Sequence, residues 1–441
     1  MAVVTKSVIL EGGYPADFSG HDPGLYHTVL DAQGGGSVIS ITNAGAVALQ
    51  FLTLTHGDGT GNCGGNGCGG GIYAFNTFLH VGDCVITNNI ASKSGSMGLG
   101  GGIYAKGDHN VYVWNNQIIS NTANIDSLST IYSYGGGIFI HSAPVLLKEN
   151  LILNNVGSRA GTGGMGGGIF LYHVAQADVL TNTIQGNKAS ISSGTGTGGG
   201  LYILGNASNT VYVAANRIEN NLTSPDHTGL GGGVYIADAN VHLDRNTIIS
   251  NATSLIGWLN PGGGVYIASS KPVTLSNNLI VDNQAGVYGG GVYVGRYISP
   301  VSQVLLVNNT IANNGDSGIV GRQYAVLTMT NNLIVSHMIG LTTSAPFTGT
   351  ISADTNLFWN TSDPITGTNG IRQDPLLTPD HHPGSGSPAL NTGLTIPWLT
   401  VDLAGVPRPQ GSGYDIGAFE GGASGETGLS VYLPLILHYS P

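Results

Sequence analysis

The chain has 441 residues and a net charge of −11, from 24 acidic and 13 basic residues, and only 8% of its residues are charged. It holds no basic cluster and no apolar stretch near the roughly 20 residues that cross a bilayer, so we expect neither nucleic acid as a partner nor a transmembrane segment. Glycine is abundant, at 72 residues, but the 41% of hydrophobic residues recur at regular intervals, which favours a packed core over disorder.

The N-terminal segment, Met1 to Lys6, forms no apolar signal sequence and is typical of the middle of a strand. We therefore expect that an export signal has been removed and that the protein is extracellular or lies on the cell surface. Cys63 and Cys68 lie in a glycine-rich loop and are a candidate disulfide pair, which suits an exported protein. Cys84 takes an apolar core position. The three cysteines match no metal-ligand spacing, so we expect no cofactor, and calcium has no supporting motif.

A glycine triplet followed by an aliphatic and an aromatic residue occurs eight times. The copies begin at Gly69, Gly100, Gly135, Gly166, Gly198, Gly231, Gly262 and Gly289. Successive copies lie between 27 and 35 residues apart. A period in this range predicts a solenoid, in which each repeat buries its apolar face only against its neighbours. We expect the triplets to form a corner that opens the aromatic strand and needs the backbone freedom of glycine.

Two asparagines follow each triplet at fixed positions. The first is Asn116, Asn150, Asn182, Asn216, Asn246, Asn278, Asn309 and Asn332 in successive repeats. The second is Asn89, Asn121, Asn155, Asn187, Asn221, Asn251, Asn283 and Asn314, with His337 ending the series. Asparagine tolerates the left-handed backbone conformation of a tight corner, and stacked asparagines hydrogen-bond to one another as ladders. The pattern therefore predicts two asparagine corners in each coil.

Apolar residues alternate on either side of the first asparagine, as at Val111, Val113 and Ile118. Strict alternation between turns is typical of half-buried strands. Each coil is therefore predicted to hold three short strands and two asparagine corners, with a loop rich in glycine, serine and threonine as the third corner. At the usual strand spacing, about ten coils would give a rod on the order of 50 Å long.

The aromatic residue after each triplet is predicted to point outward, because its aliphatic neighbours should point into the core. The eight rings are those of Tyr73, Tyr104, Phe139, Phe170, Tyr202, Tyr235, Tyr266 and Tyr293. A row of outward rings could bind sugar faces by stacking. The alternative, which we favour, is that the rings stack on one another and stabilise the sheet.

Four residues just after the aromatic strands are the best candidates for catalysis. Lys106 and Asp108 come from one coil, and His141 and His173 come from the next two. Stacking of the coils would bring several of them together, but exposed polar residues at strand ends are the commoner explanation. Paired carboxylates of the kind that glycoside hydrolysis requires are absent from the repeats. We therefore expect no catalysis, and a polysaccharide lyase or hydrolase activity is the alternative.

The repeats of residues 7–335 resemble those of right-handed parallel β-helix proteins of the pectin-lyase-like superfamily, in particular bacterial secreted proteins with similar coils. Residues 373–420 carry segments, from Gln373-Asp374-Pro375 to Gly417-Ala418-Phe419-Glu420, that resemble a choice-of-anchor module of surface-displayed β-helix proteins. The resemblance implies an all-β, right-handed parallel β-helix over residues 1–335, an irregular closing module or cap over 336–421, and a linker with an apolar tail over 422–441. Within the module, Asp402, Arg408, Asp415 and Glu420 could act as acid and base in an enzyme. We favour the structural alternative, in which Arg408 pairs with one of the three carboxylates and locks the cap.

The fold class and the anchor-like end favour a secreted or cell-surface structural or adhesion protein as the function. Val431 to Tyr439 could cap the solenoid or add to a second copy as a strand, which would give head-to-tail assembly. The alternative is a protein that binds or degrades a polysaccharide or cell-surface glycan.

Overall fold

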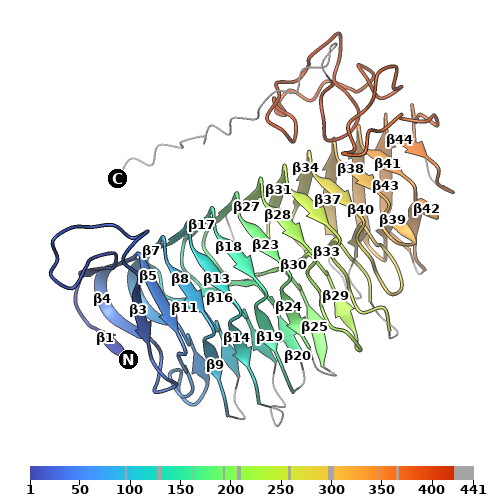
Figure 1. Cartoon of the computed structure of the whole chain (residues 1–441). Coiled ribbons are helices and arrows are strands. Elements are labelled where there is room, and N and C mark those ends of the chain that lie inside the picture. The colour runs from blue at the N-terminus through green and yellow to red at the C-terminus, as the bar shows by residue number, and fades with distance from the viewer. Residues whose placement is uncertain are drawn as a thin grey trace.

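The computed structural model describes residues 1–94, 97–126, 132–161, 163–191, 194–205, 210–256, 260–295, 302–345, 347–363 and 367–421. Its described secondary structure consists of β-strands that pair in parallel with the same segment of the next coil (Figure 1). The predicted all-β parallel solenoid is therefore confirmed. Eight coils carry the glycine triplet, and less regular coils extend the sheets at both ends.

The large sheet has 22 strands and contains two neighbouring strand positions of each coil. Two long strands, β4 (Ile39–Gln50) and β7 (Ile72–Gly82), run through both positions. The aromatic position comprises β1 (Ala2–Val4), β11 (Ile103–Lys106), β16 (Ile138–His141), β21 (Ile169–Tyr172), β26 (Leu201–Leu204), β30 (Val234–Ala237), β33 (Val265–Ala268), β36 (Val292–Val294), β39 (Ser317–Gly321) and β42 (Ile339–Thr343). The following position comprises β2 (Val8–Glu11), β12 (Val111–Trp114), β17 (Val145–Lys148), β22 (Ala177–Leu180), β27 (Val211–Ala214), β31 (Val241–Asp244), β34 (Val273–Ser276), β37 (Ser302–Val307), β40 (Ala325–Thr330) and β43 (Thr350–Asp354).

The flank sheet, as we call the 12-stranded sheet, follows the first asparagine corner. Its strands are β3 (Thr28–Asp31), β5 (Leu52–Thr55), β8 (Val85–Thr87), β13 (Gln117–Ile119), β18 (Leu151–Leu153), β23 (Thr183–Gln185), β28 (Arg217–Glu219), β32 (Thr247–Ile249), β35 (Leu279–Val281), β38 (Thr310–Ala312), β41 (Leu333–Val335) and β44 (Leu357–Trp359). The solenoid strands thus continue past residue 335, where the sequence placed the domain boundary. The late coils lose the glycine triplet but keep Asn356 and an inward Phe358, so their core pattern persists.

Two small sheets form where the sequence predicted only a loop, and we call them the outer layer. The 4-stranded sheet comprises β9 (Ile90–Ser92), β14 (Thr122–Asn124), β19 (Val156–Ser158) and β24 (Lys188–Ser190). The 6-stranded sheet comprises β6 (Gly67–Cys68), β10 (Gly98–Leu99), β15 (Ser133–Tyr134), β20 (Gly163–Met165), β25 (Thr195–Thr197) and β29 (Gly229–Leu230). The prediction of three strands per coil was too low for these coils, because the variable segments leave and return as paired strands that satisfy their backbone groups.

The core is a column of aliphatic side chains between the large sheet and the flank sheet. Ile118, Ile152 and Ile184 stack in register on successive strands, and each is 0% exposed. Burying each of these side chains stabilises the fold by about 1.5–3 kcal/mol. Because the same contact repeats from coil to coil, the stabilisation is distributed along the solenoid.

The closing module, which we define as residues 372–421, contains no strand among the described residues. It packs on the outer face of β35, β38, β41 and β44 and so lies on the flank of the solenoid, as Figure 1 shows. The module therefore covers the side of the solenoid and does not cap its end, as the sequence had predicted it would. The predicted linker and apolar tail, residues 422–441, lie outside the described residues. The described part of the chain contains no helix long and apolar enough to span a bilayer.

Candidate functional site

The three glycines of a triplet have three different structural roles, shown by the copy at Gly166 to Gly168. Gly166 has a φ of +66°, which favours glycine, and the first glycine of every triplet shares a positive φ. A Cβ atom on Gly167 would lie 2.4 Å from the backbone carbon of Lys188. A Cβ atom on Gly168 would lie 2.7 Å from the carbonyl oxygen of Gly200. The predicted corner is present at the first glycine. The second and third positions require glycine because the backbone of neighbouring segments lies too close for a side chain.

The first asparagine ladder runs from Asn116 to Asn356 without a break. From Asn150 onward, each side-chain oxygen accepts two hydrogen bonds from the preceding coil. For example, Asn150 N and Asn150 Nδ2 donate to Asn182 Oδ1 at 3.0 and 2.9 Å. The amide of Asn150 also donates to the carbonyl of Val113 at 2.8 Å. The ladder predicted from the sequence is confirmed, and it extends one coil beyond Asn332.

The second ladder joins Asn89 to Asn314 by the same contacts and ends at His337. Asn314 Nδ2 donates to His337 Nε2 at 3.3 Å, so the proton of a neutral His337 lies on Nδ1. The His337 side chain is buried, and burial lowers its pKa to about 4. The histidine therefore ends the ladder as a neutral acceptor.

The left-handed corner residues are not the ladder asparagines, which corrects the sequence prediction. In each coil they are the residues immediately before them, such as Asn115 with a φ of 52° and Asn154 with a φ of 55°. The ladder asparagines must keep a conformation that directs the side chain inward along the stack. The preceding position turns the chain and points its side chain outward, away from the ladder.

The aromatic rings do point away from the core, as predicted, but they are not on the surface. Tyr104, Phe139, Phe170, Tyr202, Tyr266 and Tyr293 are each at most 6% exposed. Most neighbouring rings stack, and Tyr104 and Phe139 are parallel to within 1° at a centroid distance of 5.6 Å. Tyr202 is the exception, because its ring meets those of Phe170 and Tyr235 at 53° and 65°. Such pairs contribute up to about 1 kcal/mol each.

The outer layer covers these rings. Leu99, Tyr134 and Met165, from the 6-stranded sheet, pack against the row. The ring of Tyr134 lies 5.2 Å from that of Phe170. In this arrangement only the half-buried Tyr73 and Tyr235 leave part of a ring open to a ligand, so the row as a whole has no continuous face for a sugar chain.

The structure brings together some of the catalytic candidates. Lys106 and His141 lie side by side in register on β11 and β16, and the ring of Tyr172 lies 4.7 Å from that of His141. His173 turns the chain after β21 with a φ of 48°, and Asp108 is exposed on the turn after β11. Burial lowers the pKa of His141, and the charges of Lys106 and His173 lower it further. His141 could accept a proton here, and its catalytic role stays a prediction.

No group of three or more histidine, cysteine, aspartate or glutamate side chains among the described residues is placed to hold a metal ion. Cys63 and Cys68 form a disulfide in the turn before the first glycine triplet. Cys84 is a buried thiol whose pKa burial raises to about 12.

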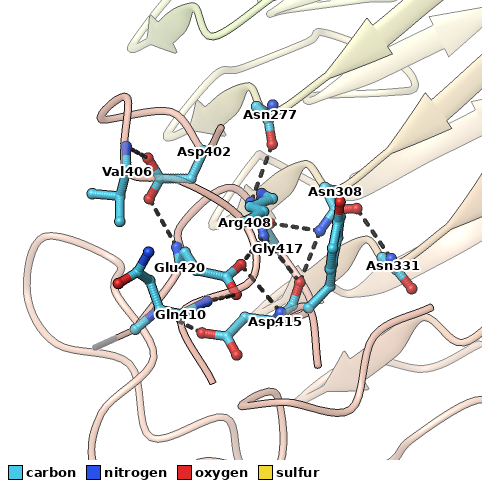
Figure 2. Close-up of polar contacts among 12 residues, drawn as sticks. Asn277, Asn308, Asn331, Asp402, Val406, Arg408, Gln410, Asp415, Gly417 and Glu420 are labelled. Atoms are coloured by element: carbon cyan, nitrogen blue, oxygen red, sulfur yellow. Dashed lines mark hydrogen bonds and ion pairs between the residues drawn. The ribbon is translucent and has the colours of Figure 1, made fainter. Parts of the chain in front are cut away.

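The expected ion pair of the closing module forms between Arg408 and Glu420, at 2.5 Å (Figure 2). Arg408 also donates to the carbonyl oxygens of Asp415 and Gly417, at 3.3 and 2.8 Å. A further contact from Arg408 reaches Asn277 Oδ1 on the solenoid at 3.1 Å. One buried arginine thus ties two segments of the module to the flank of the solenoid.

The carboxylates around Arg408 are bound by backbone amides. Asp402 accepts from the amides of Val406 and Glu420 at 2.7 and 2.8 Å. Asp415 accepts from the amides of Asn391 and Gly421 at 2.6 and 2.5 Å. Burial raises the pKa of Asp402, Asp415 and Glu420, and the charge of Arg408 opposes that rise in all three. The carboxylates are at most 5% exposed, so this arrangement serves to lock the module.

The module docks through left-handed corner asparagines, which the sequence analysis did not single out. Asn277 Nδ2 donates to the carbonyl of Val401 at 2.9 Å, and Asn308 Nδ2 donates to that of Asp415 at 2.8 Å. Asn331 both donates to and accepts from the backbone of Leu394, at 2.8 and 2.9 Å. The adjacent pairs of asparagines in the last coils were the feature of the sequence that could have identified this docking surface.

A polar cluster beside the module was also missed by the sequence analysis. Ser276 Oγ donates to Asp244 Oδ1 at 2.6 Å and lies 2.8 Å from His242 Nε2. The His242 ring lies between Tyr212 and Trp398, at 6.0 and 6.1 Å. Tyr212 is 46% and Trp398 50% exposed. We call Tyr212, His242 and Trp398 the aromatic platform. It was not predictable from the repeats because Trp398 comes from the module.

Residues 203–358 match the family model described as a right-handed β-helix region. No curated protein matches the chain. The match covers the coils from β26 to β44 and agrees with their parallel pairing. The chain is therefore a parallel β-solenoid whose residues 203–358 match the right-handed β-helix family.

Proposed function

We propose that the chain is a secreted or cell-surface structural protein that acts as a rigid scaffold or adhesin. The observation that carries this proposal is the use of the repeated polar and aromatic residues for internal packing. Both asparagine ladders and the ring stack run through successive coils, and their side chains are almost entirely buried. A solenoid bonded in this way resists bending. It therefore holds its surface loops at fixed distances from one another along the rod.

The disulfide between Cys63 and Cys68 supports the extracellular assignment, because disulfides persist in oxidising compartments. We also propose that copies of the scaffold assemble head to tail, and the first coil supports this. Among the described strands, β1, β2 and β3 each pair on one side only, and Val3, Ile9 and Val29 are 65%, 69% and 55% exposed. An open strand edge can accept a second copy head to tail.

The proposal is tested by displaying the chain on the surface of a host cell and measuring attachment to glycan-coated and protein-coated supports. Light scattering of the purified protein over a range of concentrations tests assembly. Attachment above that of cells without the chain, or concentration-dependent oligomers, supports the proposal. A monomer that gives no attachment and instead degrades a polysaccharide would overturn it.

A second candidate function, glycan binding, is favoured by the aromatic platform. Exposed tyrosine and tryptophan rings stack on sugar faces, and the half-buried Asp244 and Arg245 supply hydrogen-bonding groups beside them. Binding on a glycan array should be lost when Tyr212 and Trp398 are both changed to alanine. Tyr288, which is 48% exposed elsewhere, is the matched control for loss of an exposed ring. Equal binding by both variants would remove the platform from consideration.

The enzymatic version of this candidate depends on His141 and its neighbours. Assays for new reducing ends and for unsaturated products across acidic and neutral glycans would detect hydrolase or lyase activity. If such activity exists and uses this cluster, His141→Ala and His173→Ala should abolish it and leave the thermal unfolding temperature nearly unchanged. Activity that survives in both variants would place the chemistry elsewhere.

A further inference from the structure

The aromatic platform continues along the large sheet to a carboxylate on the neighbouring coil. Asp178 on β22 lies in register with Tyr212 on β27, and Tyr212 lies in register with His242 on β31. All three side chains point away from the core, since the residues that flank each one along its strand are buried. Adjacent strands lie about 4.8 Å apart, so the carboxylate stands next to the rings on one outer surface.

The rings of the platform are inclined to one another. The plane of the His242 ring makes an angle of 52° with that of Tyr212 and of 74° with that of Trp398. The face of an aromatic ring carries the negative end of its quadrupole. Inclined rings enclose a corner in which several such faces are directed at one group, and this arrangement attracts a cation.

The charge of Asp178 is not compensated by a neighbour. Its carboxylate is half-buried, and among the described residues it takes part in no hydrogen bond or ion pair. Burial raises the pKa of Asp178, and no charge of the described residues offsets that rise. A ligand that brings a positive charge to this carboxylate would remove the cost of its burial.

His242 adds a hydrogen-bond acceptor to the same surface. The hydroxyl of Ser276 has one proton, which it donates to Asp244, so His242 Nε2 must donate to Ser276 Oγ at 2.8 Å. Burial lowers the pKa of His242, and the charge of Asp244 opposes this effect while that of Arg245 adds to it. The neutral ring therefore carries its free lone pair on Nδ1, which is an acceptor.

We propose that the aromatic platform and Asp178 together bind a glycan that carries protonated amino groups. This inference rests on glycan binding as the function of the platform, and it names the class of sugar. The rings of Tyr212 and Trp398 contact the sugar faces, and the carboxylate of Asp178 accepts from an ammonium group. His242 Nδ1 accepts from a neighbouring ammonium or hydroxyl group.

The charges of the chain favour a cationic glycan over an acidic one. Lys148 is paired with Glu149 at 3.1 Å, and Arg245 is paired with Asp244 at 2.8 Å. These two cations flank the site and, being paired, offer little to an acidic sugar. The chain as a whole has a net charge of −11, which attracts cations and repels polyanions at a distance.

A matched pair of tetrasaccharides tests the proposal on the full chain. The tetrasaccharide of glucosamine has an amino group on every sugar, and at about pH 6 these groups are largely protonated. The tetrasaccharide of N-acetylglucosamine has the same backbone with neutral acetamide groups. We expect titration calorimetry to show binding of the amino form at least about ten-fold tighter than that of the acetylated form.

The outcomes of this comparison separate the proposal from the function on which it rests. Equal affinity for the two tetrasaccharides would overturn the preference for amino groups and leave glycan binding in place. Binding of neither tetrasaccharide would overturn both. A tetralysine peptide carries similar charges without sugar rings, and affinity for it equal to that for the amino tetrasaccharide would overturn the assignment to a glycan.

A variant of the carboxylate provides a second test. Asp178→Asn keeps the shape of the side chain and removes its charge, so it should weaken binding of the amino tetrasaccharide about ten-fold. Its affinity for the acetylated form should be unchanged. Asp226→Asn is the matched control, because Asp226 is an exposed aspartate outside the platform, and it should bind as the parent chain does. Unchanged affinity of Asp178→Asn for the amino tetrasaccharide would overturn the role of the carboxylate.

Discussion

Gly168 and Asn187 fit against each other so closely that a Cβ atom on Gly168 would lie 3.1 Å from both Cγ and Nδ2 of Asn187. The same relationship joins Gly137 to Asn155 and Gly200 to Asn221. The glycine triplet and the second asparagine ladder are therefore one structural device. The ladder can lie inside the coil only because the third glycine leaves space for its side chains.

Replacing Gly168 with alanine should lower the free energy of unfolding by about 1–3 kcal/mol, the usual cost of adding a methyl group to a packed interior. The added group would contact both the Gly200 carbonyl oxygen and the ladder amide, and neither can move without breaking hydrogen bonds. Urea denaturation followed by circular dichroism measures the change. Gly20→Ala is the control, since nothing lies within 4 Å of its Cβ position, and an equal effect at both sites would contradict the fit.

Removing one rung of the second ladder should destabilise the solenoid more strongly. Asn187 Oδ1 accepts from Asn155 N and Nδ2 at 2.9 and 3.0 Å, and Asn187 Nδ2 donates to the Ile152 carbonyl at 2.8 Å. Asn187→Ala removes a hydrogen bond from each of these three buried groups, so we expect a loss of about 3–5 kcal/mol. Asn154→Gly changes the exposed neighbour, whose positive φ suits glycine, and should shift the denaturation midpoint little.

Stability should fall as the pH is lowered from about 6.5 to about 4, in part because of His337. Its pKa is lowered to about 4 in the folded chain, whereas the pKa of a histidine in an unfolded chain is about 6.5. Within this window the unfolded chain binds a proton that the folded chain does not, which costs about 3 kcal/mol of folding free energy at the acid end.

The contribution of His337 is isolated by comparing the chain with the His337→Asn variant, which continues the ladder without a titrating group. Thermal unfolding temperatures measured from pH 7.5 to pH 4 should fall less steeply for the variant than for the parent. Parallel curves would show that His337 does not titrate in this window.

The lock of the closing module should fail when Arg408 is replaced by methionine. The variant leaves the buried carboxylates of Asp402, Asp415 and Glu420 without their cation, and breaking a buried pair in this way costs about 3–5 kcal/mol. Hydrogen exchange of residues 389–421 should rise while that of the solenoid strands stays slow. Arg372→Met removes a half-exposed arginine of the same module and should have little effect; unchanged exchange in Arg408→Met would refute the lock.

The sequence determined the solenoid, the ladder asparagines and the outward parity of the aromatic rings. These features were readable because each coil packs only on its neighbours, so a contact such as Asn150 to Asn182 appears in the sequence as a fixed repeat. The left-handed corners lay one residue earlier than expected, since a chain pattern locates a turn but not which residue adopts the positive φ.

The tertiary structure decided what covers the repeats. The burial of Phe170 depends on Tyr134 in a segment of irregular length, and the side position of the module depends on contacts such as Asn308 to Asp415, more than 100 residues apart. The aromatic platform likewise needs Trp398 beside His242. No repeat period encodes contacts between segments that occur once, because their partners are selected by surface complementarity after the coils have formed.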